Sequence, residues 1–249
     1  MDHPPQRVAL VTGGAVRVGR AISLGLAGAG YDVLLTYQSS QQPALDVQKD
    51  IETIGSRCEL VRADLCRASS ADVVVDAARE RFGRLDLVVN SAASFEARPL
   101  LEVDADAWDR TMNLNARAPH LVVRAASDLL RTVGGCVVNI TDLSAFQPWT
   151  EYPHHAVAKA ALAHLTRVQA RALAPHVRVN GVAPGAVMPP DDWPQARQDA
   201  LAASAPLQRV GSPRDVVDAV LYFAGASLVT GQILVVDGGR ILGASGPPR

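Results

Sequence analysis

Lysine, cysteine and long apolar runs are scarce in this chain of 249 residues, and each scarcity excludes a class of protein. Lys and Arg together number 24 against 25 Asp and Glu, which gives a formal net charge of -1. This balance argues against a general binder of nucleic acid or anionic membranes, because such proteins need an excess of basic charge. Only Lys49 and Lys159 are lysines, so any lysine in a chemical site must be one of them.

The cysteines, Cys58, Cys66 and Cys136, are odd in number and show no C-x-x-C spacing. We therefore expect neither a disulfide framework nor a zinc or other metal site, and a reducing compartment is favoured. No apolar run reaches the ~18 residues of a membrane span, and residues 1–5 lack the basic and apolar regions of a signal peptide. These features predict a soluble cytoplasmic protein with no nucleic-acid or membrane partner.

Hydrophobic residues make up 48% of the chain, enough to bury a sizeable core. Short β-branched or Leu-rich runs alternate with longer segments rich in Ala, Arg and Asp. Most runs are apolar at consecutive positions, as expected when helices cover both faces of a parallel sheet. The predicted strands are Val8–Val11, Val33–Tyr37, Cys58–Val61, Leu85–Asn90, Cys136–Thr141, Val177–Val182 and Ile233–Asp237.

Helix-length segments separate these strands, and this alternation is typical of a doubly wound α/β fold. No repeat, low-complexity linker or second core interrupts it. We therefore predict a single domain over residues 1–249, a Rossmann-type doubly wound parallel sheet of about seven strands with helices on both faces. The predicted helices are Val18–Ala29, Pro43–Ile54, Ala71–Phe82, Asp106–Leu130, His155–Ala174 and Pro213–Phe223.

The least regular segment is Pro184–Pro206, which leaves the carboxyl end of a predicted strand. Ligands of open parallel sheets bind beyond these strand ends, and long Pro-rich segments in compact domains are usually functional or mobile. We expect a mobile loop that covers the substrate; the alternative is a tolerated insertion. The segment carries Trp193, the acidic pair Asp191 and Asp192, and the prolines Pro184, Pro189, Pro190, Pro194 and Pro206.

A glycine-rich turn, Thr12–Arg20, joins the first predicted strand to the first predicted helix. Glycines at such a turn let the backbone approach a pyrophosphate, and the helix N-terminus offers free N–H groups. The Arg17 guanidinium can pair with phosphate there. A βα turn without ligand is the alternative. The candidate cofactor residues of this turn are Thr12, Gly13, Arg17, Val18 and Gly19.

No acidic residue follows the second predicted strand, which continues into Gln38, Ser39 and Ser40. NAD sites usually place Asp or Glu there, on the ribose hydroxyls. A 2′-phosphate would meet no repulsion there and could bond to Ser39, Ser40 and Arg17, so we predict NADP(H) as the cofactor, although no second arginine follows this strand. Asp64, after the third strand, is a candidate for the adenine side or else an exposed acid at a strand end.

With these motifs, the chain resembles the short-chain dehydrogenase/reductase family over essentially its whole length. The matching pieces are Thr12–Gly19, Asp64, Asn90–Ala93, Asn115, Val137–Thr141, Ala158–Leu162, Arg178–Gly185, Val229–Gln232 and Val236–Gly239. The resemblance implies further cofactor contacts from Asn90, Ala92, Lys159, Pro184, Gly185 and Val187. Because family members mostly form tetramers, it also implies a homotetramer.

Within that family the chain looks most like the pteridine reductases. Arg17 replaces the middle glycine of the usual turn, Phe95 follows Asn90–Ala93, and Asp142 stands where the wider family has its catalytic serine. In pteridine reductases the matching phenylalanine stacks on the pterin, and the matching arginine reaches the substrate. The resemblance therefore implies substrate contacts from Arg17, Phe95 and Asp142. Loop packing for Phe95 and a turn or cap role for Asp142 are the alternatives.

The resemblance also implies the chemistry: hydride leaves a nicotinamide for a C=N or C=O carbon, and a tyrosine supplies the proton. A lysine four residues later, on the same helix face, holds the nicotinamide ribose. Lys159 fits that lysine, and Asn115 fits an asparagine that bends a helix and helps carry a relay water. His155 occupies the place of the tyrosine, thirteen residues after Asp142. Tyr152, three residues earlier, is the alternative proton donor.

Imidazolium is a competent general acid near neutral pH. Lys159 would disfavour the charged form of His155, whereas Asp142 would favour it. Three hypotheses follow: an NADPH-dependent reductase of a pterin or dihydrofolate-like ring, a reductase of simple ketones or acyl carbonyls, and a dinucleotide-binding sensor or scaffold without turnover. The catalytic candidates are Asp142, His155, Lys159 and Asn115.

Overall fold

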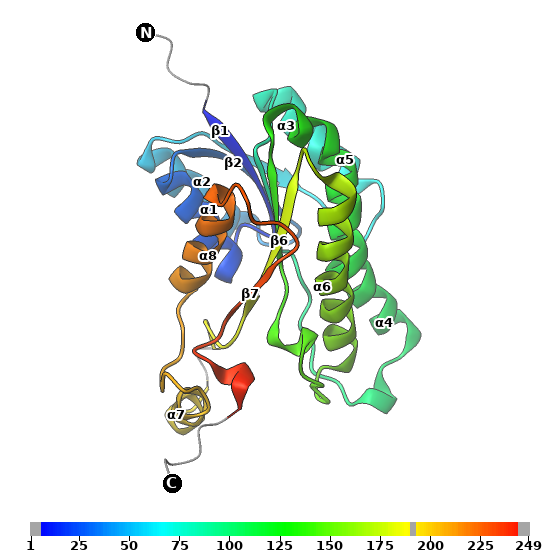
Figure 1. Cartoon of the computed structure of the whole chain (residues 1–249), viewed down its shortest axis with the longest axis vertical. Helices are drawn as coiled ribbons and strands as arrows, with labels where there is room; N and C mark the ends of the chain where they lie inside the picture. The colour runs from blue at the N-terminus through cyan, green and yellow to red at the C-terminus, as the bar shows by residue number, and fades with distance from the viewer. Residues whose placement is uncertain (1–5, 190–192, 244–249) are drawn as a thin grey trace.

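A central parallel sheet organises the chain in the computed structural model, which describes residues 6–189 and 193–243 (Figure 1). The strand order is β3-β2-β1-β4-β5-β6-β7, and all neighbouring strands are parallel. The predicted doubly wound fold is therefore confirmed. The strands are β1 (Arg7–Thr12), β2 (Tyr31–Tyr37), β3 (Cys58–Arg62), β4 (Leu87–Asn90), β5 (Cys136–Ile140), β6 (Arg178–Pro184) and β7 (Ile233–Val236).

Helices cover both faces of this sheet (Figure 1). On one face lie α1 (Arg17–Gly28), α2 (Gln41–Ile54) and α8 (Pro213–Gly225). On the other lie α3 (Ser70–Phe82), α5 (Ala118–Val133) and α6 (Pro153–Leu173). The strand order reverses between β1 and β4, so a crevice for a ligand is expected beyond the carboxyl ends of these two strands.

The sheet separates two hydrophobic cores, which explains why its strands are apolar at consecutive positions. In β1, Ala9 and Val11 belong to the core shared with α1 and α8, whereas Val8 and Leu10 belong to the core shared with α3 and α5. Successive side chains of a strand point to opposite faces. The consecutive apolar residues Val8–Val11 of β1 are therefore all buried, on one side or the other.

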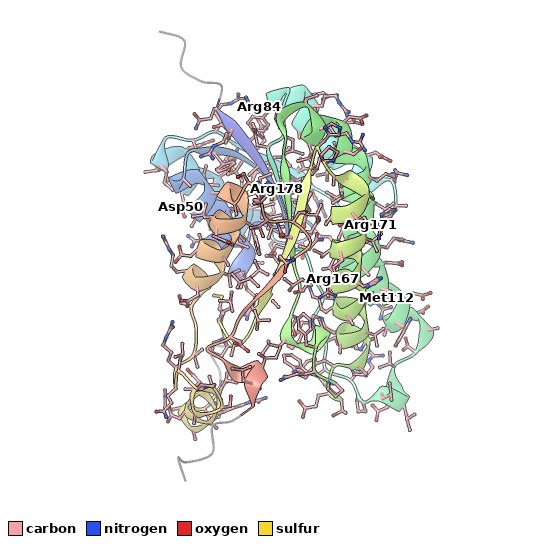
Figure 2. All side chains as sticks on the ribbon, viewed as in Figure 1. Asp50, Arg84, Met112, Arg167, Arg171 and Arg178 are labelled. Carbon is pink, nitrogen blue, oxygen red and sulfur yellow. The ribbon has the colours of Figure 1, made fainter. Side chains whose placement is uncertain are left out.

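Arg178, at the start of β6, fixes the carboxyl end of α8 to the sheet (Figure 2). Its guanidinium donates to the carbonyl oxygens of Phe223, Ala224 and Ala226 at 2.6, 3.0 and 2.9 Å. A cation at the carboxyl end of a helix satisfies free carbonyls and complements the helix dipole. This bond network helps hold α8 against the strands.

The prediction of one regular helix over Asp106–Leu130 is wrong. The structure has α4 (Ala105–Met112), a π-helical turn η2 (Asn113–Arg117) and then α5. Pro119 explains the interruption, because it has no N–H to donate to the carbonyl of Asn115 and its ring crowds that carbonyl. The N–H of Ala118 instead bonds the carbonyl of Asn113, one residue further back than in an α-helix.

The segment 184–206 is more regular than predicted, since it contains α7 (Gln195–Ala203). Pro190, Asp191 and Asp192 lie outside the described residues, and the mobility of the loop stays a prediction. Other predicted boundaries shift by one or two residues; β2 begins at Tyr31, for example. Across residues 6–189 and 193–243, no helix is long and apolar enough to span a membrane, and no cluster of His, Cys, Asp or Glu could hold a metal ion.

Candidate active site

The turn between β1 and α1 forms a glycine cradle at the point where the strand order reverses. Gly13 has a φ of +64°, and a Cβ on it would lie 2.9 Å from the Cα of Ala92. A Cβ on Gly19 would lie 2.1 Å from the carbonyl oxygen of Gly13. No side chain caps the N-terminus of α1, where Val16 is the N-cap residue. The bare backbone and the free N–H groups suit an anion such as a pyrophosphate.

A cavity of about 370 Å³ opens at this cradle and extends past the carboxyl ends of β1, β2 and β4. Of the predicted cofactor residues, the lining includes Gly13, Arg17, Val18, Gly19, Gln38, Ser39, Ser40 and Ala92. Sequence reasoning missed Ala15, Val16, Thr36, Tyr37, Ala63, Leu65, Ser91, Ala93 and Leu114. Most of these directly adjoin a predicted residue, and extending each motif by one position would have found them.

Two predicted cofactor residues hold the strand ends beside the cavity rather than lining it. The Thr12 hydroxyl accepts the N–H groups of Ser91 and Ala92 at 3.0 and 3.1 Å, which ties β1 to the segment after β4. Asn90 donates to Asn139 Oδ1 at 2.8 Å and joins β4 to β5. Both side chains therefore fix the shape of the cavity edge.

The carboxylate of Asp64 is engaged within its own turn. It accepts the N–H of Cys66 at 3.0 Å and lies 3.6 Å from the Arg67 guanidinium. This geometry matches the alternative of a turn acid at a strand end, and a contact to adenine stays a prediction. Four further predicted cofactor residues also lie outside the cavity lining: Lys159, Pro184, Gly185 and Val187.

Arg17 adopts a backbone conformation that glycine normally occupies. Its φ is +50°, in the left-handed region, where most side chains are strained. The guanidinium donates to the carbonyl oxygen of Met188 at 2.6 Å and so connects the glycine cradle to the segment after β6. A strained residue held in this way is often found at a functional site.

His155 lies in the first turn of α6 and is only 3% exposed. Its Nδ1 lies 2.9 Å from the carbonyl oxygen of Ser94, which has no hydrogen to donate. The short contact is therefore a hydrogen bond only if Nδ1 carries the proton. Nε2 has no hydrogen-bond partner among the described residues and lies 3.9 Å from Asp142 Oδ2. Nδ1 is thus engaged, whereas Nε2 is buried without a hydrogen-bond partner among the described residues.

Asp142 presents an ionised carboxylate beside this free nitrogen. Its Oδ1 accepts the N–H of Ser144 at 2.7 Å and caps the short helix η3 (Leu143–Ala145). Burial alone would raise the pKa of Asp142, but the adjacent His155 ring and the hydrogen bond from the Ser144 N–H lower that pKa below its usual value. The turn role considered for Asp142 is thus present, and Oδ2 remains directed to His155.

Asn115 fixes the position of the Ser94 carbonyl, which contacts His155. It is fully buried in η2, where its Oδ1 accepts the Ser94 N–H at 2.9 Å and its Nδ2 donates to the Ser94 carbonyl at 3.0 Å. This two-point bridge fixes Ser94, and Asn115 Nδ2 also lies 3.2 Å from His155 Nδ1, so Asn115 contacts the imidazole ring directly. The helix is interrupted at Asn115, as the resemblance implied, but both ends of the side-chain amide are engaged by Ser94.

Lys159 is one turn further along α6 and completely surrounded by protein. Its Nζ donates to the carbonyl oxygen of Ile140 at 2.8 Å. Burial lowers the pKa of the Lys159 ammonium to about 8, although the Asp142 carboxylate opposes this shift. The structure therefore brings Asp142, His155 and Lys159 to one end of the sheet, as predicted from their spacing.

The lowered pKa of Lys159 should make stability depend on pH. The amine loses its proton near pH 8 in the folded chain but near pH 10.5 when unfolded, so the unfolded state binds more protons between these values. The free energy of unfolding should rise with pH across this interval, on the order of 1–3 kcal/mol, relative to Lys159→Met. Urea unfolding of both proteins at several pH values measures this difference; a constant difference would contradict a buried ammonium.

Phe95 contributes an aromatic wall at the mouth of the cavity. Its ring is 56% exposed and stacks on Tyr152, with centroids 4.1 Å apart and planes 11° apart. It also meets the His155 ring edge-on at a centroid distance of 4.8 Å. Tyr152 is the N-cap residue of α6, as its place at the helix entrance predicted. Sequence reasoning missed this stack, because it joins residues far apart in the chain.

Comparison with known proteins agrees with this architecture. The family described as Enoyl-(Acyl carrier protein) reductase matches residues 14–240. An L-rhamnose 1-dehydrogenase (NAD(P)(+)) from Sphingomonas sp. (strain SKA58) is 32% identical over 242 residues, which are 94% of this chain and 95% of that protein. A 3-oxoacyl-[acyl-carrier-protein] reductase from Synechocystis sp. (strain ATCC 27184 / PCC 6803 / Kazusa) is 30% identical over 241 residues, 95% and 97% of the two chains.

A solved structure is also similar. It is that of a blue fluorescent protein from a metagenomic library in complex with NADPH, at 34% identity and a TM-score of 0.87. The similarity covers 94% of this chain and 97% of that one. The likeness therefore extends over nearly the whole fold, including the strands and turns that form the cavity.

Proposed function

Because the chain belongs to the short-chain dehydrogenase/reductase family of oxidoreductases, we propose that it is an NADPH-dependent reductase of a C=N bond in a flat, pterin-like ring. The glycine cradle supports the cofactor, since a Cβ on Gly13 or Gly19 would collide with Ala92 or with the Gly13 backbone and force open the turn that offers free N–H groups to a phosphate. The relatives named for NAD(P)(+) or bound to NADPH support the same choice.

The residues that would hold the cofactor follow from the cavity. The cradle and Arg17 would bind the pyrophosphate, and Gln38, Ser39 and Ser40 would surround the adenosine ribose with its 2′-phosphate. Lys159 would hold the nicotinamide ribose, as the family resemblance implies. When bound, NADPH supplies the hydride.

In this proposal the protein handles the proton. Nε2 of protonated His155 donates its proton to the substrate nitrogen while the adjacent carbon receives hydride, so C=N becomes CH–NH. The Ser94 carbonyl keeps the other ring proton on Nδ1. A proton donor held in place in this way contributes typically 10²–10⁴-fold to rate. Phe95 would stack on the ring of the substrate, and Arg17 would reach it from the cradle.

The carboxylate of Asp142 is the observation that favours C=N over C=O. Reduction of a ketone develops negative charge on oxygen, which a neighbouring carboxylate repels and cannot stabilise by donating a hydrogen bond. As His155 transfers its proton, the C=N group becomes cationic and would pair with Asp142 while the carbon receives hydride. The low pKa of Asp142 keeps this negative charge present at neutral pH.

Reduction of a simple carbonyl is the second candidate, because one relative is named a 3-oxoacyl-[acyl-carrier-protein] reductase and another an L-rhamnose 1-dehydrogenase. The substrates of this second candidate function would be simple ketones or acyl carbonyls. A dinucleotide-binding protein without turnover remains the third hypothesis. Assays with both substrate classes separate these functions.

Replacing Asp142 by serine should change the preferred substrate class. A hydroxyl can donate a hydrogen bond to a developing alkoxide, whereas it cannot pair with a cationic C=N group. We expect Asp142→Ser to lose roughly 10- to 100-fold in kcat/KM for a dihydropterin, since charged hydrogen bonds contribute about 1.5–3 kcal/mol, and to gain activity on a β-keto ester.

The measurement is NADPH consumption with each substrate, and Asp218→Ser, a change of the same kind on the outer surface of α8, serves as the control. If the parent protein already prefers the β-keto ester, the C=N assignment is wrong and the carbonyl reading holds.

A further inference from the structure

Arg62, on the neighbouring strand β3, lies beside the end of β2. No arginine follows β2 directly in the sequence. In the parallel pair of β2 and β3, Tyr37 lies opposite Arg62, the last residue of β3. The Arg62 guanidinium reaches across and donates from Nε to the carbonyl oxygen of Gln38 at 3.1 Å. Strand register thus brings a cation to the residues that follow β2.

The positive charge of Arg62 is not neutralised by an acid. Among the ion pairs within residues 6–189 and 193–243, none includes Arg62, whereas nearby Arg20 pairs with Asp50 and Arg67 pairs with Asp64. Arg62 is exposed to solvent. Among the described residues its guanidinium is bonded through Nε alone, so its terminal nitrogens can take an anionic partner.

The groups beside Arg62 suit a phosphate. Gln38, Ser39 and Ser40 line the cavity, and none carries negative charge. Ser40 is the N-cap residue of α2, yet its hydroxyl makes no capping bond and is free for a ligand. No acidic residue occurs in the first turn of α2. A phosphate at this edge would therefore meet one cation and several hydrogen-bond donors, and no repulsive charge.

We propose that Arg62 binds the 2′-phosphate of NADPH and is the main residue that selects it over NADH. Arg17 belongs to the pyrophosphate cradle and bonds Met188, on the other side of α1's N-terminus, so it is less suited to this task. The inference rests on the proposed use of NADPH. Arg62 adds a cation to bind the 2′-phosphate, which Ser39 and Ser40 alone do not supply.

Binding titrations test this assignment without relying on turnover. The probes are NADPH, NADH and the fragments 2′,5′-ADP and 5′-AMP, titrated into the parent protein, Arg62→Ala and Arg79→Ala. Arg79 lies on α3 and pairs with Asp76, so its loss changes the net charge equally without touching the cavity. Arg62→Ala should weaken NADPH and 2′,5′-ADP roughly 10- to 100-fold, the usual effect of a charged hydrogen bond.

NADH and 5′-AMP should bind Arg62→Ala as they bind the parent, and Arg79→Ala should bind all four probes normally. Arg62→Glu should prefer NADH, because its carboxylate would repel the 2′-phosphate. If Arg62→Ala weakens all four probes equally, or none, the assignment to Arg62 is overturned while a preference of the parent for NADPH still stands. If the parent itself binds NADH as tightly as NADPH, the cofactor proposal fails, and the role of Arg62 fails with it.

Discussion

Replacing His155 by alanine should lower kcat by about 100-fold or more, the usual contribution of a general acid. Nε2 of His155 is the free nitrogen of a ring whose other side is fixed by Ser94. The loss should be seen in kcat, since only imidazolium can donate the proton directly. The affinity for NADPH should change little, because Lys159 rather than His155 would hold the ribose.

Stopped-flow or steady-state NADPH oxidation over pH 5–9 measures this effect. His164→Ala is the matched control, because His164 is an exposed histidine on the same helix. His155→Tyr should move the pH optimum upward and keep or raise turnover. If His155→Ala retains kcat, Tyr152, Asp142 or a water is the donor and the assignment is wrong. If only His155→Tyr turns over, the natural protein is a nucleotide binder without activity.

Replacing Gly19 by alanine should abolish tight NADPH binding and destabilise the fold. The added Cβ would lie 2.1 Å from the Gly13 carbonyl oxygen, a distance that forces the cradle to open. Forcing atoms into a packed site typically costs about 1–3 kcal/mol of stability. Since the cradle and the N-terminus of α1 would move together, we expect the NADPH affinity to fall more than about tenfold, the equivalent of 1.4 kcal/mol.

Gly28→Ala is the matched control, because Gly28 is in the same helix and a Cβ there meets nothing within 4 Å. It should leave NADPH binding unchanged and the protein equally or slightly more stable. Urea unfolding and NADPH fluorescence titration measure both variants. Normal NADPH affinity in Gly19→Ala would show that the cradle is not the phosphate site.

The sequence predicted the sheet because its strands are apolar at consecutive positions. Residues 8–11 of β1 each have a core on one side or the other, and a sheet covered on both faces needs this pattern. Apolar periodicity continues through Asn115, so the pattern predicted one helix over Asp106–Leu130, and only the family resemblance and Pro119 pointed to the interruption there. α7 was missed because the surrounding prolines concealed a helix of nine residues.

The site was predictable where its residues lie on short motifs. The spacing of Asp142, His155 and Lys159 placed them together, and the glycine turn located the cavity. The Ser94 carbonyl that orients His155 could not be found, because a backbone acceptor has no sequence signal. Arg62 was overlooked because strand register, not chain order, brings it to β2. The homotetramer remains a prediction, since a single chain is described.

Transfer of a deuterium label tests the central claim most directly. The protein would be incubated with NADPH deuterated at the transferring C4 position, in separate reactions with a dihydropterin and with a β-keto ester. Mass spectrometry of the products then reports where the hydride goes. We predict one deuterium on the carbon of the reduced C=N bond of the pterin and much slower labelling of the hydroxy ester. Labelling of the ester alone, or of neither product, would contradict a C=N reductase.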